Sequence, residues 1–281
     1  MANSIYDIIT DKILAKLESG VAPWHKSWSV QTPINFLTGK EYRGINTFLL
    51  AGFEDPRFMT FNQIKTLKGT IKKGAKSEIV VFWSKAENKN QNAENINEDE
   101  EEMINSKKFI LRYYNVFNAQ DIEGIDFPIL ETNNNNTIEN AQNLAGTYLK
   151  NLASFKHGGD KAYYAPATDH IQMPALNSFD SSEEYYSVLF HEIAHSTGHE
   201  TRLNRKGITE LSRFGSHSYS FEELVAEMTS AFVCSSVGIE NTIDNSAAYI
   251  QGWSKALKEN KKMILIAASQ AQKAADYILK F

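Results

Sequence analysis

The sequence contains one cysteine, Cys234, so no intrachain disulfide can form. A chain without a disulfide framework is typical of a reducing compartment. No apolar run approaches the roughly 18 residues that a membrane-spanning helix requires. Residues 1–20 lack the long apolar core and the cleavage-site pattern of a signal peptide, and their apolar positions have helical spacing. From these absences we expect a cytoplasmic protein with no membrane partner.

Charge is distributed unevenly along the chain. The composition, with 42% hydrophobic and 22% charged residues, is typical of a globular protein that buries a substantial core. The formal net charge is −5, but residues 1–85 hold 12 Lys and Arg against 7 Asp and Glu, which gives +5 there and −10 for the remainder. A length of 281 residues favours two domains of ordinary size. We therefore expect a basic N-terminal part and an acidic remainder of the chain.

Two polar, asparagine-rich stretches divide the chain. Residues 86–106 contain five consecutive acids and too few apolar residues to order themselves, so they predict a mobile insertion between two strands. Residues 131–140 include four consecutive asparagines and predict a linker between a domain at 1–130 and a domain at 141–281. The patterns favour an α+β fold, with a mainly helical second domain whose small antiparallel sheet turns within residues 161–174.

Capping boxes predict where three helices begin. A capping box is a Ser or Thr followed three residues later by Glu or Gln. The sequence has three of them before segments with helical apolar spacing: Thr60 with Gln63, Ser181 with Glu184, and Ser220 with Glu223. The first helix of the chain is expected to start after Ser4 and stop at Gly20, and the helix that starts at Ser181 is expected to stop at Gly198.

The segment FHEIAHSTGHETRLNR contains a metal-binding pattern. His191 and His195 are four residues apart, so on a helix both imidazoles can point at one ion. Glu192 flanks them, where it could take a proton from a water molecule held by the metal, as in zinc peptidases. The pattern also occurs by chance, and the alternatives are two histidines satisfied by backbone carbonyls or a metal with a purely structural role.

The following helix offers further ligands. Glu223 and Glu227 are again four residues apart, and we expect Glu223 to be the third ligand and Glu227 to hydrogen-bond a ligand histidine. Glu222 is expected to face solvent. Such a His2Glu set binds one divalent ion, zinc first, with manganese or cobalt as alternatives. The longer pattern HExxHxxGxxH is not met, because Thr201 stands at its last position and His199 comes too early.

An oxyanion-stabilising residue and a peptide-binding edge are less well defined. Five residues near the motif could stabilise a developing negative charge, and their spacing selects none of them: Tyr163, Tyr164, Arg202, His217 and Tyr219. Each of them has an ordinary structural role as its alternative. The predicted strand pair within residues 161–174 could supply an edge on which an extended peptide lies, or it could be a plain edge.

Cations and aromatic residues gather in the first 85 residues. The cations are Lys65, Lys68, Lys72, Lys73, Lys76 and Arg43, and the aromatic residues include Trp24, Trp28 and Tyr42. Single-stranded nucleic acid is bound by this combination, because cations follow the phosphates and aromatic rings stack on bases. Aromatic residues more often fill cores and lysine-rich helix faces are usually only solvated, so the pattern alone leaves DNA binding as one hypothesis among others.

Several segments resemble a known family. IYDIITDKILAKLESGVAPWHKSW, PINFLTGKEYRGINTFLL, FMTFNQIKTLKGTIKKGAKSEIVVFW and YYNVFNAQDIEG resemble the N-terminal domain of ArdC-type antirestriction proteins. DHIQMP, FHEIAHSTGHETRLNR and EELVAEMTSAF resemble the zincin-like metallopeptidase domain of the same proteins. The resemblance spans nearly the whole chain in order. It implies a single-stranded DNA-binding domain, a zincin fold with ligands at His191, His195 and Glu223 and a catalytic Glu192, and carriage on mobile elements that must survive host restriction.

Three hypotheses follow. The first is an antirestriction protein that shields entering single-stranded DNA and whose zincin-like domain also cleaves a protein. The second is a metalloprotease whose basic domain recruits a protein substrate. The third is a DNA-binding module with a structural metal. Nothing in the sequence indicates an oligomeric state.

Overall fold

A computed structural model of the chain describes residues 4–18, 22, 32–85, 108–129, 137–209, 217–239 and 247–281. The first half contains α1 (Ile5–Glu18), β1 (Ile34–Asn35), α2 (Ile45–Leu49), β2 (Arg57–Thr60), α3 (Phe61–Thr66), β3 (Thr70–Ile71), β4 (Glu78–Lys85), β5 (Phe109–Asn118) and β6 (Ile122–Glu123). The second half contains α5 (Thr137–Leu149), β7 (Ser154–His157), β8 (Tyr163–Ala165), β9 (His170–Met173), α6 (Ser182–Thr197), α7 (Lys206–Thr209), α8 (His217–Val237), α9 (Ala247–Glu259) and α10 (Met263–Leu279). The two-domain α+β prediction is confirmed.

The larger sheet belongs to the first half and has the order β1-β2-β5-β4. Its main feature is the antiparallel pair β4–β5, which runs in register from Glu78 opposite Val116 to Lys85 opposite Phe109. Both strands were predicted from their apolar runs, which β-branched and aromatic residues dominate. The predicted insertion at 86–106, between the two strands, lies outside the described residues.

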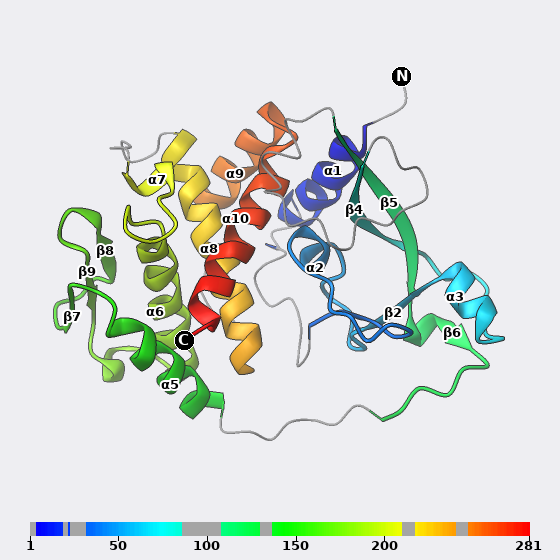
Figure 1. The fold of residues 1–281 in the computed structure, drawn as a ribbon, viewed down its shortest axis with the longest axis horizontal. Coiled ribbons are helices and arrows are strands. Elements are labelled where there is room, and N and C mark those ends of the chain that lie inside the picture. Colours follow the sequence, from blue (N-terminus) through cyan, green and yellow to red (C-terminus); the bar gives the residue numbers. More distant parts are fainter. Residues whose placement is uncertain are drawn as a thin grey trace.

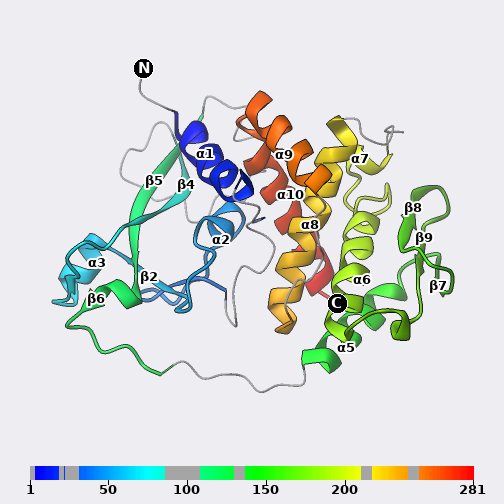
Figure 2. The same ribbon diagram turned by 180° about the vertical axis from the view of Figure 1, so that it is seen from behind.

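The smaller sheet belongs to the second half and has the order β7-β9-β8. The antiparallel pair β8–β9 was predicted, and its turn passes through Asp169 with a left-handed φ of 45°. Strand β7, which pairs parallel with β9, was missed because four residues with no clear alternation give little signal. This sheet lies beside α6 in both views of the molecule (Figures 1 and 2).

Helix starts follow the capping signals in three of four cases. The side chain of Thr60 accepts a hydrogen bond from the Gln63 N–H and that of Gln63 accepts one from the Thr60 N–H, a complete capping box. Ser4 caps α1, and Ser181 caps α6 by accepting from the Glu184 N–H at 3.1 Å. The prediction for Ser220 is wrong, because α8 already includes His217. Ser220 is therefore an interior residue of the helix and not its cap.

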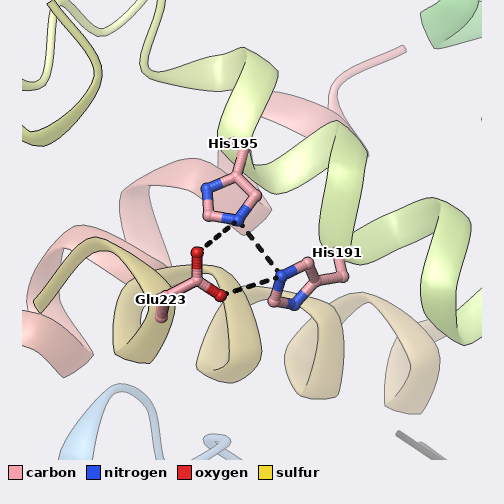
Figure 3. A group of neighbouring side chains, drawn as sticks. All are labelled: His191, His195 and Glu223. Carbon is pink, nitrogen blue, oxygen red and sulfur yellow. Dashed lines mark hydrogen bonds and ion pairs between the residues drawn. The ribbon is translucent and has the colours of Figure 1, made fainter. Parts of the chain in front are cut away.

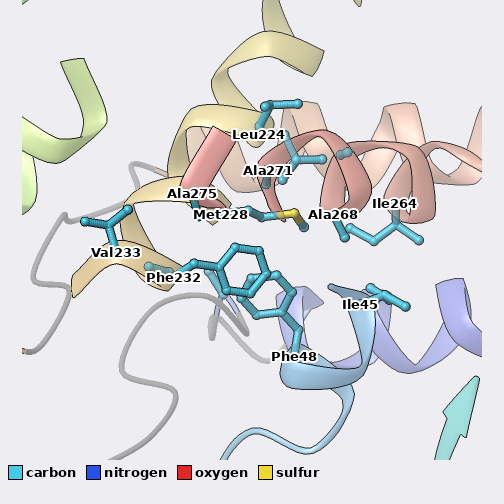
Figure 4. Packing of buried hydrophobic residues seen from close by; sticks show 14 of the residues in the cluster. Ile45, Phe48, Leu224, Met228, Phe232, Val233, Ile264, Ala268, Ala271 and Ala275 are labelled. Carbon is cyan, nitrogen blue, oxygen red and sulfur yellow. The ribbon is translucent and has the colours of Figure 1, made fainter. Parts of the chain in front are cut away.

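The two halves share one hydrophobic core. Helices α1 and α2 lie between the larger sheet and helices α8 to α10 (Figures 1 and 2). Phe48 of α2 is fully buried and stacks on Phe232 of α8 with ring centroids 4.8 Å apart (Figure 4). The same cluster continues through Ile264 and Ala268 of α10. Packing across the two halves therefore fixes the helices of the second half relative to the sheet of the first.

The connection between the halves is only partly described. Residues 130–136 of the chain fall outside the described residues, and α5 already begins at Thr137, within the predicted linker at 131–140. The domain boundary near residue 130 stays a prediction. Among the helices that the structure describes, none is long and apolar enough to cross a membrane.

Candidate metal centre

Helix α6 presents the two histidines to α8. It is buried over most of its surface from Tyr185 to Thr197, which explains why its sequence is apolar around the HExxH pattern. The helix ends at Gly198, as predicted. A Cβ at Gly198 would lie 2.6 Å from the Ile208 side chain and 3.0 Å from the Arg205 guanidinium. The chain can therefore fold back against the end of α6 only because this position is glycine.

Three side chains converge between α6 and α8. The Nε2 atoms of His191 and His195 are 3.1 Å apart, and each lies 3.5 Å from an oxygen of Glu223 (Figure 3). All three donor atoms lie within 4.8 Å of one another. The two imidazole planes are nearly perpendicular, at 84°. The predicted ligands are thus brought together at one point, which neither helix could achieve alone.

This arrangement fits a divalent metal. Ligand atoms about 2.0–2.1 Å from zinc at tetrahedral angles lie roughly 3.3 Å from one another. The two Nε2 atoms are 3.1 Å apart, close to that value, and each lies 3.5 Å from a different oxygen of Glu223, Oε2 for His191 and Oε1 for His195. Two neutral imidazoles and one carboxylate are also a donor set that zinc and manganese accept. His191, His195 and Glu223 could therefore hold one divalent ion between the two helices.

Electrostatics favour a cation at this point. Burial by itself would lower the pKa of His191, but the hydrogen bond to Glu223 and the carboxylates of Glu227 and Glu192 outweigh it and raise that pKa to about 9. Burial raises the pKa of Glu227 to about 7. His191 Nδ1 and Glu227 Oε2 are buried without a hydrogen-bond partner among the described residues, and His191 Nδ1 lies 3.8 Å from Glu227 Oε1. In the metal-free protein these raised pKa values favour a bound proton on His191 and Glu227. A metal cation would compete with that proton for the same site.

Glu222 does not face solvent, which corrects the expectation from sequence. It is 3% exposed, and its two oxygens accept hydrogen bonds from Arg205 Nε at 3.1 Å and Nη2 at 2.5 Å. Its Oε1 also lies 3.3 Å from His195 Nδ1. Burial would raise the pKa of Glu222, but the Arg205 charge and the His195 hydrogen bond hold it below its usual value. An ionised Glu222 therefore orients His195 so that Nε2 points at the centre.

Arg205 ties this carboxylate to the end of α6. Besides Glu222, its guanidinium donates to the Ala194 carbonyl at 2.8 Å and to Thr197 Oγ1 at 2.6 Å. Gly207 allows the close approach, because a Cβ there would lie 2.9 Å from Glu222. No local signal in the sequence reveals the role of Glu222, because its partner Arg205 lies 17 residues earlier in the chain.

The remaining predicted residues near the motif have varied surroundings. Glu192 is 8% exposed on α6, one residue from His191, and its charge contributes to the raised pKa of that histidine. His199 is outside the cluster of donors and its Nδ1 pairs with Thr201 Oγ1 at 2.9 Å. Glu192 thus acts electrostatically on a predicted ligand, and its role as the base stays a prediction.

The oxyanion candidates separate into two groups. Arg202 binds Asp169 and donates from Nε to the Ser196 carbonyl at 2.7 Å, and Tyr164 donates to Asp169 Oδ1 at 2.9 Å. These contacts tie the β8–β9 turn to the end of α6, so both residues have the structural role that was the alternative. Tyr163 is 47% exposed, and the side chains of His217 and Tyr219 lie outside the described residues.

The predicted DNA-binding residues lie in the first half. Exposed side chains follow α3 and the turn into β4, namely Lys65, Lys68, Lys72, Lys73 and Lys76. Lys72 donates to the Gln120 carbonyl at 2.6 Å. Arg43 pairs with Asp276 of α10 at 2.5 Å, and Tyr42 is half-buried against Phe58. Trp24 and Trp28 lie outside the described residues.

Comparison with known proteins identifies the family to which the chain belongs. A model of the N-terminal domain of the anti-restriction factor ArdC matches residues 3–117, and a model of a zincin-like metallopeptidase matches residues 143–270. The protein y4eC of Sinorhizobium fredii is 33% identical, over 98% of this chain and 91% of y4eC. The DNA primase TraC of Escherichia coli is 32% identical over 98% of this chain, which spans only 20% of that longer protein.

Two solved structures agree with the fold. Antirestriction ArdC from plasmid R388 is 34% identical, in a metal-free structure with a TM-score of 0.75 and a Mn(II)-bound structure with a TM-score of 0.76. The alignments cover 99% of this chain and 97% and 98% of those chains. The chain belongs to the ArdC family of antirestriction proteins, with an ArdC N-terminal domain followed by a zincin-like metallopeptidase domain.

Proposed function

We propose that this protein acts in the cytoplasm, binds single-stranded DNA through its N-terminal half, and shields entering DNA from host restriction while holding one divalent metal in its C-terminal half. The convergence of His191, His195 and Glu223 within 4.8 Å is the observation that carries the metal half of this proposal. Membership of the ArdC family carries the antirestriction half.

The basic surface supports single-strand binding. Five exposed lysines follow α3 and the turn after it, in a chain whose overall charge is negative. Each phosphate that a cation neutralises on a single strand contributes roughly −0.7 to the slope of log K against log salt, so five contacts would give a slope of about −3.5. Fluorescence anisotropy with labelled single- and double-stranded oligonucleotides at several salt concentrations tests this. Absence of binding even at low salt would contradict the proposal.

The metal site supports a peptidase. When bound, a divalent metal polarises a carbonyl oxygen and lowers the pKa of a water molecule. Zinc is the ion we propose first, and manganese is supported by the Mn(II)-bound relative. The Glu192 carboxylate would accept a proton from a water molecule, and Glu222 would keep His195 in the tautomer that leaves Nε2 free. Glu227 would accept a hydrogen bond from Nδ1–H of His191. The edge strand β8, in a sheet beside α6, offers an extended substrate main-chain partners.

A glutamine at position 192 separates the three hypotheses. Glu192→Gln removes the base and leaves the ligands, so a peptidase should lose cleavage and keep its metal. Protection of an unmodified plasmid in a restricting host should persist in this variant if DNA binding alone carries antirestriction. Loss of both cleavage and protection would favour a metalloprotease that acts on a recruited protein. Cleavage that survives the substitution would exclude Glu192 as the base, and the absence of any cleavage with an intact metal would favour a structural ion.

A further inference from the structure

The β4–β5 hairpin has two faces with different surroundings. Side chains alternate between the faces of a strand. Ile79, Val81 and Leu111 lie on the face that belongs to the main core. Val80 and Val116 lie on the opposite face, in a small separate cluster at one end of the hairpin. Only that end of the opposite face is packed by this cluster.

Aromatic rings and a cation continue this opposite face. Phe82 and Tyr114 stack with ring centroids 4.5 Å apart and planes only 5° from parallel. Tyr114 is 46% exposed, although an aromatic ring usually buries its large apolar surface. Arg112 is directly opposite Phe82 in the register, and its Nε donates to Ser84 Oγ at 2.8 Å. This face therefore presents the stacked rings of Phe82 and Tyr114 beside the guanidinium of Arg112.

A pocket of about 650 Å³ opens next to this stack. Its volume lies within the range of about 300–1,000 Å³ that is typical of small-molecule sites, so it can accept a nucleobase. Its lining includes Tyr42, Phe82, Tyr114, Asn35, Lys40 and Arg43. Glu41 adds one carboxylate to these two cations. The ion pair of Arg43 with Asp276 is more than half exposed on both sides, so it is weak and a phosphate can replace the carboxylate.

We propose that this face, formed by Phe82, Arg112, Tyr114 and the adjoining pocket and called here the β4–β5 platform, binds unstacked bases of single-stranded DNA. The inference rests on the proposed single-strand binding and identifies where the bases lie. Open aromatic rings on a sheet, with arginine beside them, bind bases by stacking. Bases in a duplex are already stacked and paired, so such a platform selects single strands. The pocket also reaches Gln63 of α3, the helix that carries Lys65.

A pair of neighbouring tyrosines provides the test. Tyr113 and Tyr114 are 45% and 46% exposed, but they are consecutive in β5 and so point to opposite faces. The probes are a labelled thymidine oligonucleotide and an abasic oligonucleotide of the same length, which has the same phosphates and no bases. Tyr114→Ala should weaken binding of the thymidine strand about tenfold, the effect of losing one stacked base. Tyr113→Ala should bind it with an affinity within about twofold of the parent's, because Tyr113 is not on the platform face and does not stack on the bases.

The abasic strand separates base contacts from phosphate contacts. Parent and Tyr114→Ala should bind it equally, because both keep their cations. Circular dichroism should show both tyrosine variants folded, with Tyr114→Ala destabilised by no more than the loss of its stack on Phe82. Equal binding of the thymidine strand by the two variants, with the parent still binding it, would overturn the platform and leave single-strand binding intact. Failure of the parent to bind either strand would overturn the proposed function itself.

Discussion

Substitution of Glu222 by glutamine should weaken both the fold and the metal centre. Glu222 and Arg205 are 3% and 7% exposed, and two hydrogen bonds join them. Removing the carboxylate charge leaves the guanidinium buried without its counter-ion. Breaking a buried ion pair by removing one partner costs about 3–5 kcal/mol. We expect the free energy of unfolding of the metal-free protein to fall by about that amount.

The same substitution should lower metal affinity. Glu222 lies 3.3 Å from His195 Nδ1 and keeps Nε2 aimed at Glu223. Replacing a group that orients a ligand histidine typically costs about 10–100-fold in affinity, or roughly 1.4–2.8 kcal/mol. Competition with a chelating dye measures this loss, and urea denaturation followed by circular dichroism measures the loss of stability.

A control and a double variant make the test specific. Glu259→Gln, at the exposed end of α9, removes the same charge without a buried partner and should change neither quantity. Glu222→Leu combined with Arg205→Met should be more stable than Glu222→Leu alone, because no buried charge is left unpaired. A loss below about 1 kcal/mol for Glu222→Gln, together with unchanged metal affinity, would refute the reasoning.

Three further predictions follow from buried groups. Burial raises the pKa of the Cys234 thiol to about 12, so a thiol reagent at neutral pH should modify it only on unfolding; rapid modification of the native protein would contradict this. The folded-state pKa values of His191, about 9, and Glu227, about 7, lie above the ordinary 6.5 and 4.5. Their contributions to stability are complete below those ordinary values and are lost as the pH rises through 7 and 9, so the melting temperature of the metal-free protein should fall across that window, and a rise would contradict it. Phe48→Ala should cost about 3–5 kcal/mol in urea denaturation, because a fully buried ring is removed between the two halves, and a loss below about 1 kcal/mol would show that α2 does not join them.

Local rules predicted much of the fold. The caps at Thr60 and Ser181 are visible in the sequence because a cap needs only residues three apart. Helical spacing likewise predicted that His191 and His195 share a face, and the spacing in the next helix suggested Glu223. These features depend on contacts within one element or between two neighbouring helices.

Features that depend on distant packing were not predictable in the same way. The burial of Glu222 depends on Arg205, which arrives from a loop that folds back over Gly198 and Gly207. The platform depends on the register that sets Phe82 diagonally across from Tyr114, and residues 86–108 separate those strands in the sequence. A shared core between the halves likewise needs the packing of α2 on α8, which no local pattern specifies.

The most direct test of the metal centre is isothermal titration calorimetry of Mn²⁺ into the metal-free protein and into Glu223→Gln. We expect one ion per chain for the parent, with proton release at neutral pH because the raised pKa of His191 leaves that ring protonated until the metal binds. We expect a large loss of affinity for the variant, since Glu223 supplies the only carboxylate among the three converging donors in the described part of the chain. Binding of Mn²⁺ by Glu223→Gln with the stoichiometry and affinity of the parent would contradict the site.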